Sequence, residues 1–256
     1  MNYRLAFSST LALMCLATGA QAADYPSCNE LPKYESLVEA LKAARLQNNG
    51  GLNLDMWGTI VDRSGTVCAV AYTGAMPGSQ WPGSRVISAQ KAYTANAFSL
   101  DGLALSTANL YSAVQPGGSL FGLQESNPVN VAAAYKGVFD DFGKNVDPMV
   151  GSVVGGVNVF GGGLALYGVD GRIVGGLGVS GDTSCADHNI AWRTRATLKL
   201  DYVTAGVAPT KNDQIIYDVA AGKSPSGYGH PTCGGKEPEV AATLPPTSKV
   251  AAPAQK

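Results

Sequence analysis

The chain has 256 residues, of which 45% are hydrophobic and 14% are charged, so it holds enough apolar side chains for a substantial core. Its formal net charge is −1 at pH 7, which argues against a nucleic-acid-binding protein, because such a protein needs a clustered basic face. The length suits one domain, or one domain with extensions.

Residues 1–22 have the pattern of a secretory signal peptide. Arg4 supplies a positive n-region, residues 5–16 are apolar, and residues 20–22 (Ala-Gln-Ala) form an A-x-A cleavage site. The alternative is a membrane anchor, but the apolar run is shorter than the roughly 20 residues that a span requires. We therefore expect a periplasmic or secreted protein without a membrane span, with a mature chain that begins at Ala23.

The first elements are predicted from periodicity and turn residues. Residues 31–47 carry apolar side chains at i, i+3, i+4 and i+7, which indicates an amphipathic helix that two glycines end. Residues 54–61 and 66–73 are strand-like runs around a short polar turn, which is typical of a β-hairpin. Residues 84–99 predict a second helix.

Residues 100–156 show turn signals and little periodicity, apart from a short helix within 129–142. Long irregular loops are uncommon unless they are functional, so this segment is a candidate cover for a pocket. Residues 163–169 and 172–179 then flank an Asp-Gly turn, the strongest short hairpin signal. A third helix is predicted over about 185–204.

This order of elements indicates an α+β protein with a mainly antiparallel sheet and packed helices, in a profilin-like layered arrangement. We place the domain at residues 23–206 and a C-terminal extension at 207–233. Residues 234–256 are rich in Pro, Ala and Lys without periodicity, so a disordered tail is expected there.

The start of the third helix carries a capping-box pattern. Ser184-Cys185-Ala186-Asp187 fits [ST]-x-x-[DE], in which the serine caps the helix and the aspartate reaches back to the cap. We therefore expect Ser184 as the N-cap.

One face of this helix is chemically unusual. Four side chains recur there at helical spacing: Cys185, His188, Trp192 and Arg195. In one interpretation this face lines a pocket, and His188 binds a ligand or titrates. In the other, Asp187 only caps the helix, Cys185 is half of a disulfide and His188 lies on the surface.

Four cysteines follow the signal peptide, and an even count in an oxidising compartment suggests two disulfides. We favour Cys185–Cys233, because the Gly- and Pro-rich segment before Cys233 can fold back, and Cys28–Cys68 then remains. The two other connectivities stay open.

A zinc site is the rival interpretation of the same residues. His230 and Cys233 are spaced as H-x-x-C, which mirrors Cys185 and His188 and gives two Cys and two His ligands. Either arrangement brings His230 towards His188. No C-x-x-C-H motif is present, so covalent haem attachment has no support.

Three stretches together resemble the GlcG/HbpS family. They are VDRSGTVCAVAYTGAMPGS, ISAQKAYTANAFS and GGGLALYGVDGRIVGGLGVSGDTSCADHNIA. They contain a V-D-x-x-G hairpin, a helix with K-A-x-T-A, and a closing glycine-rich run before the last helix. The resemblance covers about residues 35–105 and 160–204, and the segment between them looks longer than the family norm.

The resemblance implies the fold and a haem-related role, since some members are described as haem-binding sensors or haem-degrading proteins, and members tend to form oligomers. Lys91 and Thr94 match the K-A-x-T-A motif, so the ammonium could pair with a carboxylate ligand; the alternative is a solvated or oligomer-facing lysine. Haem held without a covalent link needs an apolar slot and an axial ligand, which His188 would supply, with His230 as a partner. Helix N-termini favour anions, so propionates or another carboxylate could sit on the amides after Gly181, near Asp182; the alternative is that this glycine only makes a tight strand-to-helix turn.

The leading hypothesis is therefore a periplasmic or secreted homo-oligomeric protein that binds haem or a similar tetrapyrrole. The candidate ligand-binding residues are Lys91, Thr94, Asp182, Cys185, Trp192 and Arg195, with His188 and His230 at the iron. One alternative is an enzyme acting on a small carboxylated metabolite with His188 as the catalytic acid or base. The other is a non-catalytic oligomeric scaffold.

Overall fold

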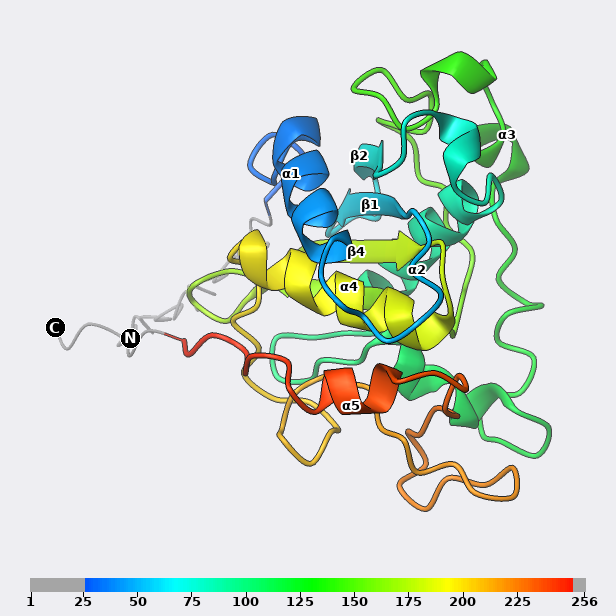
Figure 1. Ribbon diagram of the computed structural model, residues 1–256, viewed down its shortest axis with the longest axis vertical. Coiled ribbons are helices and arrows are strands. Elements are labelled where there is room, and N and C mark those ends of the chain that lie inside the picture. Colours follow the sequence, from blue (N-terminus) through cyan, green and yellow to red (C-terminus); the bar gives the residue numbers. More distant parts are fainter. Residues whose placement is uncertain (1–25, 251–256) are drawn as a thin grey trace, which may run out of the picture.

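The computed structural model describes residues 26–250, so the predicted signal peptide lies outside the described residues. Figure 1 shows a central sheet between helices, with the C-terminal segment running beside α4. In the described part of the chain, none of the helices combines the length and the apolar character needed to cross a bilayer.

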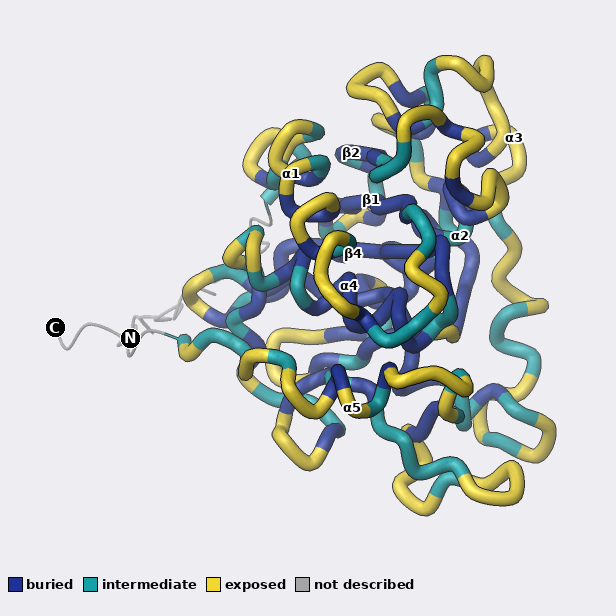
Figure 2. The backbone as a smooth tube through the Cα atoms, in the orientation of Figure 1, coloured by how far each residue is buried: buried dark blue, intermediate teal, exposed yellow. Residues whose placement is uncertain are grey.

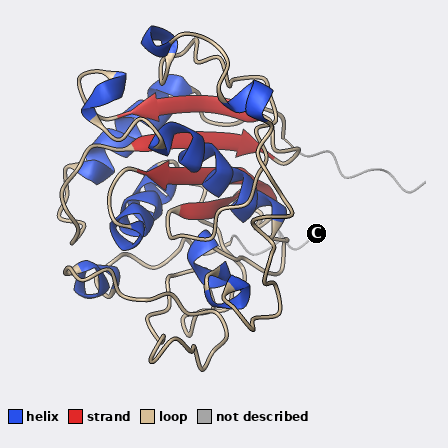
Figure 3. Ribbon diagram, turned by 90° about the vertical axis from the view of Figure 1, so that its right-hand side faces the viewer, coloured by secondary structure: helices blue, strands red, loops and turns tan. Residues whose placement is uncertain are grey.

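The sheet has four antiparallel strands in the order β2-β1-β4-β3 (Figure 3). The strands are β1 (Trp57–Asp62), β2 (Val67–Tyr72), β3 (Gly163–Tyr167) and β4 (Ile173–Ser180). Each predicted hairpin is present, because β1 pairs with β2 and β3 pairs with β4. The predicted α+β class with an antiparallel sheet is confirmed.

Helices cover both faces of the sheet. α1 (Tyr34–Arg45) and α4 (Ser184–Thr197) lie on one face, and α2 (Ser84–Ala97) lies on the other. The strands between them are buried (Figure 2). The core under α1 and α4 includes Leu37, Leu41, Ile60, Leu177 and Ile190, and the core under α2 includes Trp57, Val61, Val70, Val86 and Ala89.

Glycines in β4 allow α2 to lie directly on the sheet. A Cβ at Gly178 would overlap the main-chain carbonyl oxygen of Ser88, and one at Gly176 would overlap that of Ala92. A glycine inside a strand is otherwise unfavourable, and close approach of another backbone is a recognised reason for it. The glycine-rich sequence of β4 is therefore explained by helix packing.

Residues 106–158 form an irregular layer that is fastened to α2. The guanidinium of Arg85 is buried and donates to Asp147 through Nε at 2.8 Å and Nη2 at 2.5 Å. The layer's helix is α3 (Val131–Ala134). Within residues 26–250, short 3-10 turns lie at Pro77–Ser79, Thr107–Leu110, Ser112–Val114 and Phe139–Asp141.

The third helix ends earlier than predicted. α4 stops at Thr197 because Lys199 adopts a left-handed conformation with φ 56°, and the chain then turns towards β3. There the carbonyl of Leu200 accepts a hydrogen bond from the amide of Tyr167 at 2.8 Å. Pairing with the sheet edge replaces the last helical turns.

The prediction of a disordered tail is wrong for residues 234–250. α5 (Glu237–Ala241) lies within this segment, and its Val240 and Ala241 are buried. Asn189 of α4 donates to the carbonyl oxygen of Glu237 at 3.1 Å, and Thr183 donates to the carboxylate of Glu237 at 2.6 Å. Composition indicated disorder, but these specific contacts with α4 order the segment.

We predict that Gly178→Ala destabilises the protein by about 1–3 kcal/mol, because the new methyl group can only fit if α2 moves away from β4. Urea denaturation of the variant and the wild type measures this loss. Gly102→Ala is the matched control, since a Cβ at Gly102 meets no atom within 4 Å. Equal stability of Gly178→Ala and the wild type would contradict the packing described here.

Candidate functional site

Both favoured disulfides are present in the structure. The Cα atoms of Cys28 and Cys68 lie 5.0 Å apart, and those of Cys185 and Cys233 lie 6.0 Å apart. The two sulfurs that the zinc hypothesis requires as separate ligands are thus bonded to each other.

The capping box is displaced by one residue from its predicted place. Thr183 is the N-cap of α4, and its hydroxyl accepts from the amide of Ala186 at 3.2 Å. Asp187 reaches back as expected, but to the amide of Asp182 at 2.9 Å. Threonine, like serine, is a preferred N-cap residue, and Gly181 two residues before it adopts φ 155° at the turn from β4 into the helix.

The unusual face of α4 is covered by the C-terminal segment of the same chain. His188 is fully buried, with 0% of its surface exposed, and its Nε2 accepts a hydrogen bond from the amide of Ile215 at 3.1 Å. Trp192 donates from its indole nitrogen to the carbonyl oxygen of Pro245 at 2.9 Å. The face is a docking surface for residues 213–245.

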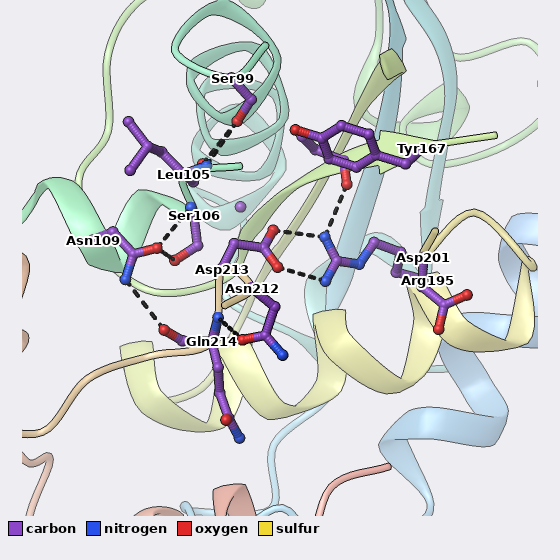
Figure 4. A network of polar contacts seen from close by, with 12 residues as sticks. Ser99, Leu105, Ser106, Asn109, Tyr167, Arg195, Asp201, Asn212, Asp213 and Gln214 are labelled. Atoms are coloured by element: carbon purple, nitrogen blue, oxygen red, sulfur yellow. Dashed lines mark hydrogen bonds and ion pairs between the residues drawn. The ribbon is translucent and has the colours of Figure 1, made fainter. Parts of the chain in front are cut away.

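A buried ion pair anchors this segment (Figure 4). The guanidinium of Arg195 forms a bidentate pair with Asp213, at 2.6 and 2.7 Å, and also donates to the carbonyl oxygen of Ala165 at 2.9 Å. Beside it, Asn109 donates to the carbonyl oxygen of Gln214 at 3.2 Å. Both charged side chains are 0% exposed, so each depends on the other for its neutralisation.

The environment of His188 keeps its ring neutral. Burial, together with the nearby Arg195 guanidinium, lowers the pKa of His188 to about 3. Because Nε2 accepts a hydrogen bond from the amide of Ile215, the proton of the neutral ring is on Nδ1, which is buried and has no hydrogen-bond partner among the described residues. A ring held in this way cannot act as an acid or base near neutral pH.

His230 lies at the N-terminal end of the covered face of α4, beside the Cys185–Cys233 disulfide. Its Nδ1 donates to the carbonyl oxygen of Pro231 at 2.7 Å, and its Nε2 lies 3.3 Å from the hydroxyl of Ser184. Burial lowers the pKa of His230 to about 4. His230 therefore offers an unprotonated Nε2 that points towards Ser184.

A surface pocket of about 320 Å³ lies at the N-terminal ends of α2 and α4. Two of its walls are exposed aromatic rings: Trp81 is 54% exposed and Phe160 is 44% exposed. The other lining residues are Ser84, Ile87, Lys91, Ser180, Asp182, Ser184 and Asp187. Segments far apart in the sequence thus form one pocket, with an apolar rim and polar side chains at its base.

The floor of this pocket is a buried ion pair. Lys91 Nζ lies 2.7 Å from Asp187 Oδ2 and also donates to the carbonyl oxygen of Val179 at 3.1 Å. Burial raises the pKa of Asp187 to about 6, although the charge of Lys91 opposes that rise. Gly162 makes room for the pair, since a Cβ there would lie 3.1 Å from Lys91 Nζ.

The structure divides the predicted ligand-binding residues into two groups. Lys91 and Asp182 line the pocket, whereas Cys185, Trp192 and Arg195 contact the C-terminal segment. Thr94 is buried away from the pocket and accepts from the amide of Asn158 at 3.0 Å.

Residues 100–156 contribute no lining residue to this pocket, contrary to the cover expected there. Sequence reasoning missed Trp81, Phe160 and the pairing of Asp187 with Lys91. Trp81 lies in a Pro- and Gly-rich loop, and the presence of a large aromatic residue in such a loop was the signal available in the sequence.

The family model described as haem degrading protein HbpS-like matches residues 33–196. The chain belongs to the HbpS-like family. The resemblance that the hairpin and glycine-rich motifs suggested is therefore confirmed, and the match ends within α4, before the segment that covers it.

Several solved structures are similar to this HbpS-like chain. A PduOC:heme complex is 26% identical, with a TM-score of 0.44, over 64% of this chain and 89% of that one. Klebsiella pneumoniae protein ORFY, of family DUF336, is 22% identical, with a TM-score of 0.47, over 73% of this chain and 97% of that one. HbpS is 13% identical, with a TM-score of 0.42, over 73% and 99%. No curated protein matches the chain.

We predict that the buried His188 makes the protein less stable in acid. Unfolding returns the pKa of His188 to about 6.5, so below that pH the unfolded chain binds more protons, and the free energy of unfolding falls as the pH falls towards 3. Asp187 acts in the opposite direction, because its folded pKa is raised above 3.8.

His188→Gln isolates the histidine contribution, since the glutamine oxygen can still accept from Ile215. Between pH 4 and 6 we expect the variant to lose less stability per pH unit than the wild type, by up to about 1.4 kcal/mol. Urea denaturation at a series of pH values measures both slopes, and the difference at pH 8 reports the packing cost of the substitution. Equal slopes would show that His188 is not buried and neutral.

Proposed function

We propose that this chain is an exported binding protein for haem or a similar flat tetrapyrrole, and that the ring is held at the pocket between α2 and α4. The observation that supports this most is the pairing of two exposed aromatic rings, Trp81 and Phe160, with a polar floor in one pocket of an HbpS-like protein. Another pocket, of about 260 Å³ near residues 45–54, has no aromatic ring in its lining.

The chemistry of the pocket suits the organic part of a tetrapyrrole. A porphyrin has flat apolar faces and a carboxylate-bearing edge, and aromatic side chains contact such faces favourably. The hydroxyls of Ser84 and Ser184 stand at the first turns of two helices, where negative charge is stabilised. The charge of Lys91 is already neutralised by Asp187, so the hydroxyls and helix ends would meet the carboxylates.

The pocket is at the small end of the range for ligand sites, about 300–1,000 Å³. A tetrapyrrole seated here would project from the protein surface. A second copy of the chain could cover the projecting edge, in keeping with the homo-oligomer that the family resemblance implies.

The side chains that line the pocket suit the porphyrin ring better than they suit the haem iron. The usual protein ligands of haem iron are His, Cys thiolate, Met and Tyr, and none of these side chains lines the pocket. His188 is buried behind Ile215, and His230 is separated from the pocket by Ser184. We therefore assign the binding to contacts with the macrocycle and derive no step from the metal.

A small carboxylated metabolite is the second candidate ligand, and the modest pocket volume favours it. The catalytic acid or base first considered, His188, is unsuited, because it is buried and neutral. Asp187 is better placed for that role, since it lies on the pocket floor and burial raises its pKa to about 6.

The test is a titration with hemin and, separately, with metal-free protoporphyrin IX. We expect both to bind saturably with dissociation constants within about tenfold of each other, because the macrocycle provides most of the contact. Trp81→Ala and Phe160→Ala should each weaken both ligands by about 2- to 10-fold, as an aromatic contact contributes about 0.5–1.5 kcal/mol.

Two variants serve as controls. Phe121→Ala removes an aromatic ring that is 66% exposed and does not line the pocket, so it reports non-specific adsorption. His188→Gln should keep full binding. If only hemin binds, and His188→Gln abolishes that binding, the proposal is contradicted. If neither hemin nor protoporphyrin IX binds, the tetrapyrrole proposal is wrong and the small carboxylated metabolite is the remaining candidate ligand.

A further inference from the structure

The two disulfides lie in opposite electrostatic environments. Around Cys28–Cys68 the near polar atoms are acceptors: Cys28 Sγ lies 3.6 Å from a carboxylate oxygen of Asp62 and 3.7 Å from the carbonyl oxygen of Thr66. Cys68 Sγ lies 3.4 Å from the same carbonyl oxygen. Negative charge on either sulfur would be repelled by these atoms.

Around Cys185–Cys233 hydrogen-bond donors face the outer sulfur. The amide of Cys185, in the first turn of α4, donates to Cys233 Sγ at 3.3 Å. The hydroxyl of Ser184 lies 3.4 Å from the same sulfur and 3.3 Å from the unprotonated Nε2 of His230, so its single proton serves two acceptors and is free to turn to a thiolate at Cys233. The inner sulfur, of Cys185, has one acceptor at 3.6 Å, the carbonyl oxygen of Pro231.

Donors change the redox chemistry of a cysteine in a known direction. A thiolate near a helix N-terminus or hydrogen-bond donors is stabilised, so it is a better leaving group and its disulfide is more readily reduced. Acceptors destabilise the thiolate and make the disulfide harder to reduce. The surroundings therefore predict that Cys185–Cys233 is the more easily reduced of the two.

Accessibility alone predicts the reverse order. Cys28 and Cys68 are both partly exposed, whereas Cys185 is fully buried and Cys233 is only partly exposed. The two explanations can thus be separated by measuring which disulfide reacts first.

We propose that Cys185–Cys233 is a redox-active disulfide that exchanges with a dithiol, and that Cys28–Cys68 is a structural disulfide. A thiolate of the dithiol attacks the partly exposed Cys233 Sγ, the protein S–S bond breaks, and its electron pair leaves on Cys185 Sγ. Cys185 stands in the first turn of α4, where the helix N-terminus stabilises the leaving thiolate until it takes a proton. The second thiol then gives up its proton and attacks the partner's own sulfur in the mixed disulfide, which displaces Cys233 as a thiolate.

The displaced Cys233 thiolate is received by the Cys185 amide and the Ser184 hydroxyl. The dithiol ends as a disulfide, and the protein disulfide ends as two sulfhydryl groups once Cys233 takes a proton. The partner is therefore identified by its chemistry as a small or protein dithiol.

Exchange would not unfasten the C-terminal segment by itself. Asp213 stays paired with Arg195, Ile215 stays bonded to His188, and Glu237 stays bonded to Asn189 and Thr183. The fold therefore has non-covalent contacts that hold this segment through a redox cycle.

The test is reduction of the native protein by dithiothreitol at pH 7, with alkylation at timed intervals and peptide mapping of the labelled cysteines. We expect Cys185 and Cys233 to be labelled about tenfold faster than Cys28 and Cys68. In buffers of reduced and oxidised dithiothreitol, we expect the two midpoints to differ by about tenfold in ratio, which is about 30 mV for a two-electron couple.

Ser184→Ala should slow reduction of Cys185–Cys233 by roughly threefold, because one donor to the thiolate is lost. Ser112→Ala is the matched control: it removes a hydrogen bond to the same segment, at the carbonyl oxygen of Gly229, without touching a sulfur. Faster or equal reduction of Cys28–Cys68, or equal effects of the two variants, would overturn the proposal. The midpoints are measured on the unaltered protein, so a variant that misfolds does not block the test, and porphyrin binding is not involved.

Discussion

The buried guanidinium of Arg195 is the constraint on which this arrangement depends. A guanidinium remains charged at any physiological pH, so a fully buried one requires a carboxylate partner. That partner, Asp213, comes from the C-terminal extension rather than from the segment that matches the HbpS-like family. The domain therefore needs the extension to neutralise the charge buried on this face of α4. Once Asp213 holds the extension there, His188, Trp192 and Cys185 on the same face contact it as well.

This cover decides where a ligand can bind. It withdraws His188 from solvent and keeps its ring neutral, so a side chain that looks like a haem ligand in the sequence serves as a hydrogen-bond acceptor for the backbone. Another face of α4, at its N-terminal end, lines the open pocket, where the exposed Trp81 and Phe160 meet the Lys91–Asp187 pair. The helix thus has two faces with different roles: one binds the C-terminal segment, and the other contributes Ser184 and Asp187 to the pocket.

Local signals in the sequence were sufficient for the hairpins, for the three long helices α1, α2 and α4, and for the favoured cysteine pairing, because each depends on periodicity, turn residues or chain flexibility. The stripe on α4 was also recognised, but periodicity identifies which residues share a face and not what covers that face. The pocket could not be predicted, since Trp81, Phe160 and Asp187 come from separate segments that only the sheet brings together. The ordered α5 was missed because its stability comes from contacts with α4 and not from its composition.

The claim that His188 belongs to an internal contact, and not to a ligand site, is tested most directly by nitrogen NMR of the histidine rings. The chain has two histidines, so a protein labelled with ¹⁵N-histidine gives a simple spectrum. We predict that His188 is a neutral ring protonated at Nδ1, and that its signals stay unchanged when gallium protoporphyrin IX, a diamagnetic substitute for haem, is added. A large shift of the His188 Nε2 signal on addition of this porphyrin, together with loss of hydrogen-exchange protection at the Ile215 amide, would contradict the claim.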